Sequence, residues 1–173
     1  MGTKARLYMA YGSNLNLTQM ALRCPTAKVV GKSELKGYEL LFRGGHRGAV
    51  ATVEPKEGST VPVLIWKIQK KDEAALDLYE GYPNFYGKEM LEVELDGRNV
   101  SAMAYIMTPG HSFGVPSDYY IDTIEQGYET AGFDTQVLTD AIERAYELAY
   151  GQGKREVFGQ ESLFGIGGYE GMK

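Results

Sequence analysis

Residues 5–15 read ARLYMAYGSNL, an apolar run that ends abruptly in Gly12, Ser13 and Asn14. The run 5–11 predicts a buried strand, and residues 16–23 predict a short helix that stops before Pro25. A turn between a strand and a helix exposes backbone N–H groups, which bind anions well. This turn therefore predicts a site for a carboxylate or a developing oxyanion. The alternative is a tight turn in which Asn14 only caps the helix.

Downstream of the turn, the chain has the character of β structure as far as residue 70. Glycines divide this region into four expected strands, at Lys28–Leu35, Tyr38–Phe42, Gly48–Val53 and Val61–Gln69. The segment PVLIWKI (62–68) is apolar on both faces, which predicts a strand in the interior of a sheet. Two more strands, Glu89–Leu95 and Val100–Met107, flank Asp96-Gly97, which is a strong hairpin signal.

Three longer helices complete the expected fold. We expect Asp72 to cap a helix that ends near Glu80, with Tyr79 on its inner face. Pro116-Ser117 opens a helix that Gly132 ends, and the last helix spans about Thr135–Tyr150. The predicted fold class is α+β: one domain over residues 1–151, with a curved mixed sheet or barrel-like core and a few packed helices. Residues 152–173 form a Gly-rich C-terminal tail.

Composition narrows the classes of partner. With 173 residues, 43% of them hydrophobic, the chain can bury a core of its own, and a net charge of −5 without basic runs argues against nucleic-acid or anionic-membrane binding. The one cysteine, Cys24, excludes an intramolecular disulfide. We find no signal peptide and no bilayer-spanning run, so we expect a cytoplasmic protein.

One acidic residue lies in an unusual setting, in the segment LYEGYPNFY (78–86). Glu80 falls at the end of the expected helix, where the helix dipole disfavours a carboxylate, and its neighbours are aromatic. Dipole and desolvation both raise a carboxyl pKa, which suits a general base or acid near neutral pH. The alternative is a solvated surface glutamate beside a turn.

Taken together and in order, several blocks resemble the gamma-glutamyl cyclotransferase superfamily. They are Tyr11–Leu15, Ala51-Thr52-Val53, Val63–Trp66, Glu80 followed by Tyr86, and Pro116-Ser117 at a helix start. The likeness extends over roughly residues 6–145. The Glu-Gly-Tyr-Pro…Tyr form is most similar to the gamma-glutamylamine branch, which includes the deprotecting enzyme of butirosin biosynthesis.

The resemblance implies an enzyme with Glu80 as its catalytic residue. It also implies substrate-binding residues, namely Tyr11, Gly12, Ser13, Asn14, Leu15, Tyr86 and Tyr105. The substrate would be a small gamma-glutamyl compound, which carries its own nucleophile, the α-amine, and its own electrophile, the γ-carbonyl. Closure of the lactam releases 5-oxoproline and needs proton transfer and correct positioning, so we expect no metal and no cofactor.

Other readings of the sequence remain open. A nucleophilic pair of Ser13 with His46 or His111, or a reactive Cys24, lacks an obvious orienting acid. The segment 44–48 (GGHRG) lacks the Lys-Ser/Thr of a phosphate-binding loop. Arg43 or Arg47 would either contact a substrate carboxylate or solvate a strand end.

Two questions reach beyond the catalytic residues. A non-catalytic small-molecule-binding module on the same fold is the main alternative to an enzyme. Apolar residues in the tail would either pack against the pocket mouth or a neighbouring subunit, which leaves a homodimer open, or belong to a solvated, disordered segment.

Overall fold

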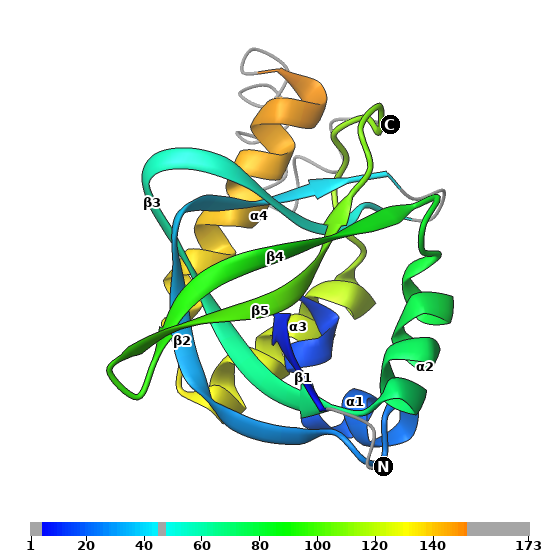
Figure 1. Cartoon of the computed structure of the whole chain (residues 1–173). Helices are drawn as coiled ribbons and strands as arrows, with labels where there is room; N and C mark the ends of the chain where they lie inside the picture. The colour runs from blue at the N-terminus through cyan, green and yellow to red at the C-terminus, as the bar shows by residue number, and fades with distance from the viewer. Residues whose placement is uncertain (1–4, 45–47, 152–173) are drawn as a thin grey trace.

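A five-stranded mixed sheet forms the centre of the protein, seen in a computed structural model that describes residues 5–44 and 48–151 (Figure 1). The strand order is β2-β3-β1-β5-β4. The strands are β1 (Arg6–Ala10), β2 (Lys28–Arg43), β3 (Val50–Ile68), β4 (Tyr86–Leu95) and β5 (Arg98–Met107). The pair β1/β5 is parallel and the other pairs are antiparallel. This arrangement confirms the α+β class with a mixed sheet.

The middle of the sheet is the strand that leads into the Gly-Ser-Asn turn. β1 lies between β3 and β5, with Tyr8 opposite Trp66 on one side and opposite Met103 on the other. Its last three residues are fully covered, because strands pair on both sides of it. The segment PVLIWKI is an interior strand, as expected, since β3 pairs with both β2 and β1. The turn after β1 therefore starts from a fixed point in the core.

The region read as four strands is in fact two long ones, so those boundaries were wrong. β2 and β3 form one antiparallel hairpin whose register jumps between Lys36↔Thr60 and Tyr38↔Pro55. Gly37 and Gly58 lie at this jump with φ of 80° and 84°, a left-handed conformation that glycine adopts without cost. The glycines bend the hairpin where we had expected them to divide it, and Figure 1 shows both strands strongly curved.

Curvature brings the two edges of the sheet together. The hydroxyl of Ser33 on β2 donates to the backbone carbonyl of Glu94 on β4. Gly31 makes room for Leu95 there, since a methyl group on Gly31 would lie 2.6 Å from Leu95 Cδ1. The sheet is thus curved towards a barrel, as the sequence led us to expect.

Short and long helices occupy the ends and one side of the sheet. They are η1 (Ser13–Leu15, a 3₁₀ turn), α1 (Leu17–Arg23), α2 (Lys70–Glu80), α3 (Asp118–Ala131) and α4 (Thr135–Tyr150). Ser117 caps α3 and Gly132 ends it in a left-handed conformation, as predicted. Asp72 is not the cap of α2: Gln69 holds that position, and Asp72 accepts its backbone N–H at 2.8 Å in a capping box.

Helix α3 packs directly against the turn that follows β1. A methyl group on Gly127 would lie 2.6 Å from Leu15 Cβ and 2.7 Å from Leu15 C, so only glycine lets the two backbones approach this closely. The Asn16 side chain donates to the Thr123 carbonyl at 3.0 Å. Helix packing and hydrogen bonding together fix the turn on α3.

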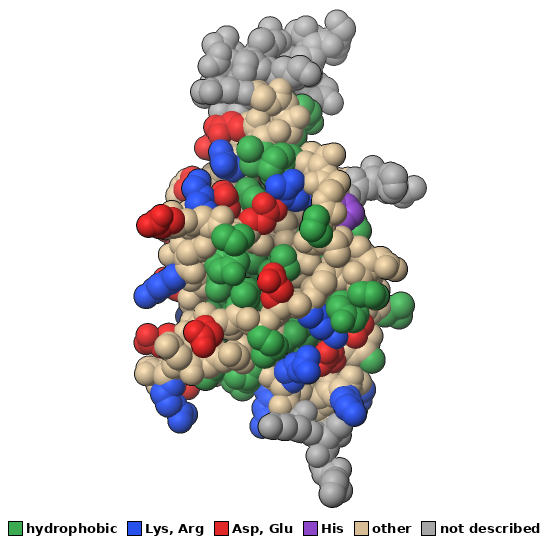
Figure 2. Space-filling view, turned by 45° about the horizontal axis from the view of Figure 1, so that its top comes forward, with side chains coloured by type: hydrophobic (Ala, Val, Ile, Leu, Met, Phe, Trp, Pro, Cys, Tyr) green, Lys and Arg blue, Asp and Glu red, His purple; other side chains and the backbone are tan. Residues whose placement is uncertain are grey.

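The surface and the chain ends add little constraint on function. None of the helices in the described part of the chain has the length and apolar character that crossing a bilayer would require. On the face shown in Figure 2, acidic and basic side chains are interspersed around exposed hydrophobic ones. The predicted tail, 152–173, lies outside the described residues.

Candidate active site

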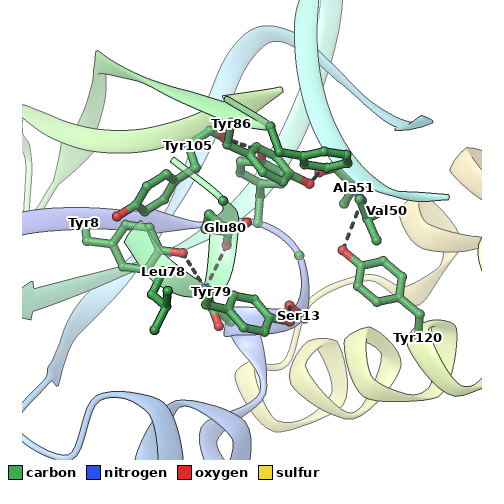
Figure 3. A pocket seen from close by; sticks show the side chains of 15 residues that line it. Tyr8, Ser13, Val50, Ala51, Leu78, Tyr79, Glu80, Tyr86, Tyr105 and Tyr120 are labelled. Atoms are coloured by element: carbon green, nitrogen blue, oxygen red, sulfur yellow. Dashed lines mark hydrogen bonds between the residues drawn. The ribbon is translucent and has the colours of Figure 1, made fainter. Parts of the chain in front are cut away.

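A cavity of about 430 Å³ opens between the end of β1, the end of α2 and the start of α3 (Figure 3). This volume is in the range of small-molecule sites. The residues that line it are Tyr8, Tyr11, Gly12, Ser13, Asn14, Val50, Ala51, Leu78, Tyr79, Glu80, Gly81, Phe85, Tyr86, Tyr105 and Tyr120. The turn and the acid singled out in the sequence therefore meet at one cavity.

The turn presents backbone donors to this cavity. Leu15 N–H donates to the Gly12 carbonyl at 3.0 Å and Asn16 N–H to the Ser13 carbonyl at 3.1 Å, which forms the 3₁₀ turn. The first N–H groups of a helical turn have no partner within it, so those of Ser13 and Asn14 are available to an anion. The Leu15 side chain is fully buried in the core and is not among those that line the cavity, and a substrate-binding role for Leu15 stays a prediction.

The sequence left open whether Asn14 caps the first helix or serves the site, and the structure assigns these two roles to different asparagines. Asn16 caps α1, because its Oδ1 accepts the N–H of Gln19 at 3.1 Å. Asn14 is therefore not the helix cap, and its side chain faces the cavity. Asn14 Nδ2 donates to the Tyr8 hydroxyl at 2.8 Å and lies 3.4 Å from Glu80 Oε1.

Glu80 is the last residue of α2. Gly81 follows it in a left-handed conformation, with φ of 65°, and ends the helix so that Glu80 stays at the cavity wall. Burial raises the pKa of Glu80 to about 7, and the nearby guanidinium of Arg23 lowers it. This raised pKa agrees with the expectation from the sequence, and it lets the carboxyl take up and release a proton near neutral pH.

The three tyrosines named from the sequence all line the cavity, and their hydroxyl groups bind to the protein. Tyr11 donates to the backbone carbonyl of Tyr105, Tyr86 to the Ala51 carbonyl at 2.5 Å, and Tyr105 to Asp77 Oδ1 at 2.5 Å. Burial raises the pKa of each of these phenols, so they stay neutral. The three hydroxyl groups are thus directed at these acceptors rather than at Glu80, and the rings line the pocket.

Sequence reasoning missed three further tyrosines at the cavity. Tyr8 bonds to Asn14, Tyr79 places its hydroxyl 3.0 Å from Ser13 Oγ, and the Tyr120 hydroxyl accepts the N–H of Ala51 at 3.0 Å. Tyr79, expected on the inner face of its helix, is 46% exposed at the cavity. A signal existed for two of them, because Tyr79 precedes Glu80 and Tyr120 lies in the Pro116-Ser117 block.

The alternative nucleophiles find no support in the described residues. His111 Nε2 lies 3.1 Å from Thr108 Oγ1 and its ring packs at a tilt against Phe85, and His111 is not among the residues that line the cavity with Ser13. Burial raises the pKa of the Cys24 thiol to about 11, which keeps it protonated and unreactive. His46 and Arg47 lie outside the described residues, and so does most of the 44–48 loop.

Arg43 contacts other residues of the protein, and the described residues form no cluster of metal ligands. Arg43 Nε donates to Glu54 at 2.6 Å and its guanidinium lies over Phe113, so it stabilises the β2–β3 hairpin. Within residues 5–44 and 48–151, no group of three or more His, Cys, Asp or Glu side chains is arranged to hold a metal ion.

Comparison with known proteins independently supports the family resemblance found in the sequence. A family model described as "Gamma-glutamyl cyclotransferase, AIG2-like" matches residues 8–128. Human gamma-glutamylcyclotransferase is 28% identical over 135 residues, which are 73% of this chain and 71% of the relative. The bovine protein of the same name is 29% identical over the same shares.

Solved structures that superimpose on this chain support the same family resemblance or the same fold. One described as gamma-glutamyl cyclotransferase superimposes with a TM-score of 0.73 at 26% identity and covers 80% of this chain and 86% of its own. YkqA from Bacillus subtilis superimposes with a TM-score of 0.71 over 84% of this chain and 55% of its own. At 21% identity, this second likeness concerns the fold alone.

Proposed function

The chain belongs to the gamma-glutamyl cyclotransferase, AIG2-like family, and from this premise we propose that Glu80 is the general base and acid of a gamma-glutamyl cyclotransferase. The reaction is intramolecular attack of the substrate α-amine on the γ-carbonyl, which releases 5-oxoproline and the group bound to that carbonyl. The observation that carries the proposal is the position of Glu80, a half-buried carboxylate at the cavity wall opposite the Gly12–Asn14 turn.

Proton transfer is the chemical work that the enzyme must do. Two protons leave the α-nitrogen between its ammonium form and the lactam, and the departing nitrogen gains two as it leaves as an ammonium ion. Glu80, with a pKa raised to about 7 chiefly by burial, can accept a proton from the α-nitrogen and return it to the leaving nitrogen. Two such transfers in succession carry both protons from the α-nitrogen to the leaving nitrogen and return Glu80 to its starting state.

Binding of the glutamyl end is the task of the turn. The free N–H groups of Ser13 and Asn14, with the Ser13 hydroxyl, would hold a negatively charged oxygen of the substrate. The rings of Tyr11, Tyr86 and Tyr105 would enclose the chain and hold it folded. Holding an amine against a carbonyl in this way is worth effective molarities of about 10⁵ M or more.

The leaving group is the finer part of the proposal. We infer that it is an amine or an amino acid, and that the reaction proceeds without a metal or cofactor. The resemblance to the gamma-glutamylamine branch favours an amine. The cytoplasmic location, the absence of a nucleic-acid partner and the homodimer stay predictions.

A substrate panel tests this function. Purified enzyme, dialysed against a chelator, is given a gamma-glutamyl alkylamine, a gamma-glutamyl amino acid and glutathione, and 5-oxoproline and the free amine are both quantified. We expect equimolar release from at least one substrate, loss of release in Glu80→Gln, and normal release in Glu125→Gln, which removes an exposed charge on α3. Substrate binding without 5-oxoproline release would favour the non-catalytic module.

A further inference from the structure

Arg23 lies next to the cavity, and the mechanism above gives it no role. It is the last residue of α1, where the helix dipole favours a positive charge. Its guanidinium donates from Nη1 to Asn14 Oδ1 and from Nη2 to Gln19 Oε1 at 2.9 Å. The same group lies over the ring of Tyr79, 3.5 Å from its centroid. Three contacts from three segments thus hold this guanidinium in place.

The contact with Asn14 decides which end of that amide faces Glu80. A guanidinium has only donors, so it binds the oxygen end of the amide. Asn14 Nδ2 is then directed to the other side, where the Tyr8 hydroxyl lies at 2.8 Å and Glu80 Oε1 at 3.4 Å. Without Arg23 the amide could rotate and present its oxygen to the carboxylate, which would repel it.

Arg23 also supplies charge to a site that otherwise has neutral neighbours. The phenols around Glu80 come from β1, the turn, α2, β4, β5 and α3, and they are Tyr8, Tyr11, Tyr79, Tyr86, Tyr105 and Tyr120. Beyond Tyr105, Lys88 forms one ion pair with Asp77 at 2.8 Å and another with Glu73 at 2.6 Å. Burial raises the pKa of Glu80, and the guanidinium of Arg23 is the charge that lowers it.

We propose that Arg23 is a positioning residue for Glu80: it turns the Asn14 amide towards the carboxylate and provides the positive charge that keeps the carboxylate ionised near neutral pH. The proposal deepens the general-base function and rests on it. The guanidinium is held by Asn14, Gln19 and Tyr79, so its effect reaches the reaction through Asn14 and through the charge state of Glu80.

Three substitutions separate charge from shape. Arg23→Gln removes the charge and keeps hydrogen-bond donors, and Arg23→Met is a second neutral variant in case the first folds poorly. Arg23→Lys keeps the charge but loses the two-pronged contact with Asn14 and Gln19. Arg98→Gln, at the exposed start of β5 in the hairpin turn, is the matched control for loss of one positive charge.

The direct readout is the titration of the Glu80 carboxyl by carbon NMR, with the signal assigned by its loss in Glu80→Gln. We expect the Glu80 pKa to rise by about 0.5–1 unit in Arg23→Gln and Arg23→Met, because the positive charge of Arg23 lowers this pKa and the neutral variants remove it. Arg23→Lys and Arg98→Gln should titrate close to wild type.

The activity readout is the pH profile of kcat/KM. Its acid limb should move to higher pH in the two neutral variants by the same amount as the titration. In Arg23→Lys the limb should stay in place while kcat falls, because the charge is kept and Asn14 loses its orientation. A merely structural role would lower activity at every pH and leave the limb unmoved in Arg23→Gln and Arg23→Met as well.

The outcomes distinguish this inference from the function on which it rests. An unchanged Glu80 titration in Arg23→Gln and Arg23→Met, with Glu80→Gln inactive, overturns the role of Arg23 and leaves the general base intact. A shifted titration with Glu80→Gln fully active refutes the general base and supports the electrostatic coupling alone.

Discussion

The side-chain nitrogen of Asn14 lies 3.4 Å from Oε1 of Glu80, although 66 positions separate the two residues in the chain. The contact exists because β1 lies in the middle of the sheet and delivers its turn to the end of α2. A donor-rich turn and a single half-buried carboxyl therefore face the same small volume.

The pH dependence of the reaction should follow Glu80. The general base must be ionised, and burial raises the pKa of this carboxyl to about 7. Below that pH we expect kcat/KM to fall about tenfold per unit. Initial rates of 5-oxoproline release between pH 5 and pH 9 check this. An acid limb near the ordinary value of 4.5 would mean that another group sets the rate.

The same raised pKa should make Glu80 unfavourable for folding at high pH. The unfolded chain releases this proton near pH 4.5 and the folded chain near pH 7, so the folded state loses stability as pH rises through that window. Glu80→Gln removes this loss. We expect the variant to exceed wild type by about 1–3 kcal/mol in free energy of unfolding at pH 8, a figure reduced for partial solvent contact.

Denaturant unfolding at pH 8 and at pH 4 measures the difference. At pH 4 both states of the wild type carry the proton for most of the time, so the two proteins should be nearly equal in stability. Wild type more stable than Glu80→Gln at pH 8 would contradict the raised pKa.

Gly127 should tolerate no side chain. A methyl group there would overlap Leu15 Cβ and the Leu15 backbone at 2.6 Å and 2.7 Å, so Gly127→Ala must displace the turn. We expect a loss of about 1–3 kcal/mol in stability and a higher KM, because the donors of the turn move. Gly87→Ala, whose methyl group would lie 3.8 Å from the Ile106 carbonyl oxygen, is the control. Equal stability of the two variants would count against close packing of α3 on the turn.

Tyr86 should matter to the fold more than to the chemistry. Its hydroxyl donates to the buried carbonyl of Ala51 at 2.5 Å, so Tyr86→Phe leaves that carbonyl without this donor. We expect a loss of about 1–3 kcal/mol in thermal or denaturant unfolding, with KM and kcat nearly kept because the ring remains. Tyr119→Phe, with its side chain 75% exposed, should change nothing. A large fall in kcat with unchanged stability would instead place the Tyr86 hydroxyl in the reaction.

The sequence predicted the helix caps and the hairpin turn correctly, because these features depend on residues within a few positions of one another. Ser117 as a cap and Gly132 as a helix end act within one turn of α3. Asp96 and Gly97 both adopt positive φ, the conformation that a two-residue hairpin requires. Gly37 and Gly58 show the limit, because a glycine in a left-handed conformation serves a turn or a bulge equally well. The choice depends on the partner strand, which the sequence does not reveal.

The candidate site likewise contains some residues that the sequence singled out and others that only the folded structure brings to the cavity. Glu80 and the Gly12–Asn14 turn stand out in the sequence, because their residue types and positions at element ends suit the chemistry. The burial of the Leu15 side chain could not be predicted locally, because it depends on the packing of the turn against Gly127 of α3. Tyr8 and Arg23 escaped notice, since each acts across a tertiary contact with Asn14 that no local pattern encodes.

The most direct test of the general base is single-turnover release of 5-oxoproline by Glu80→Gln, with substrate binding measured on the same sample. We predict binding close to wild type and a release rate lower by about 10²–10⁴-fold, the usual contribution of a positioned acid or base. Release at the wild-type rate from a variant that binds and folds normally would contradict the account.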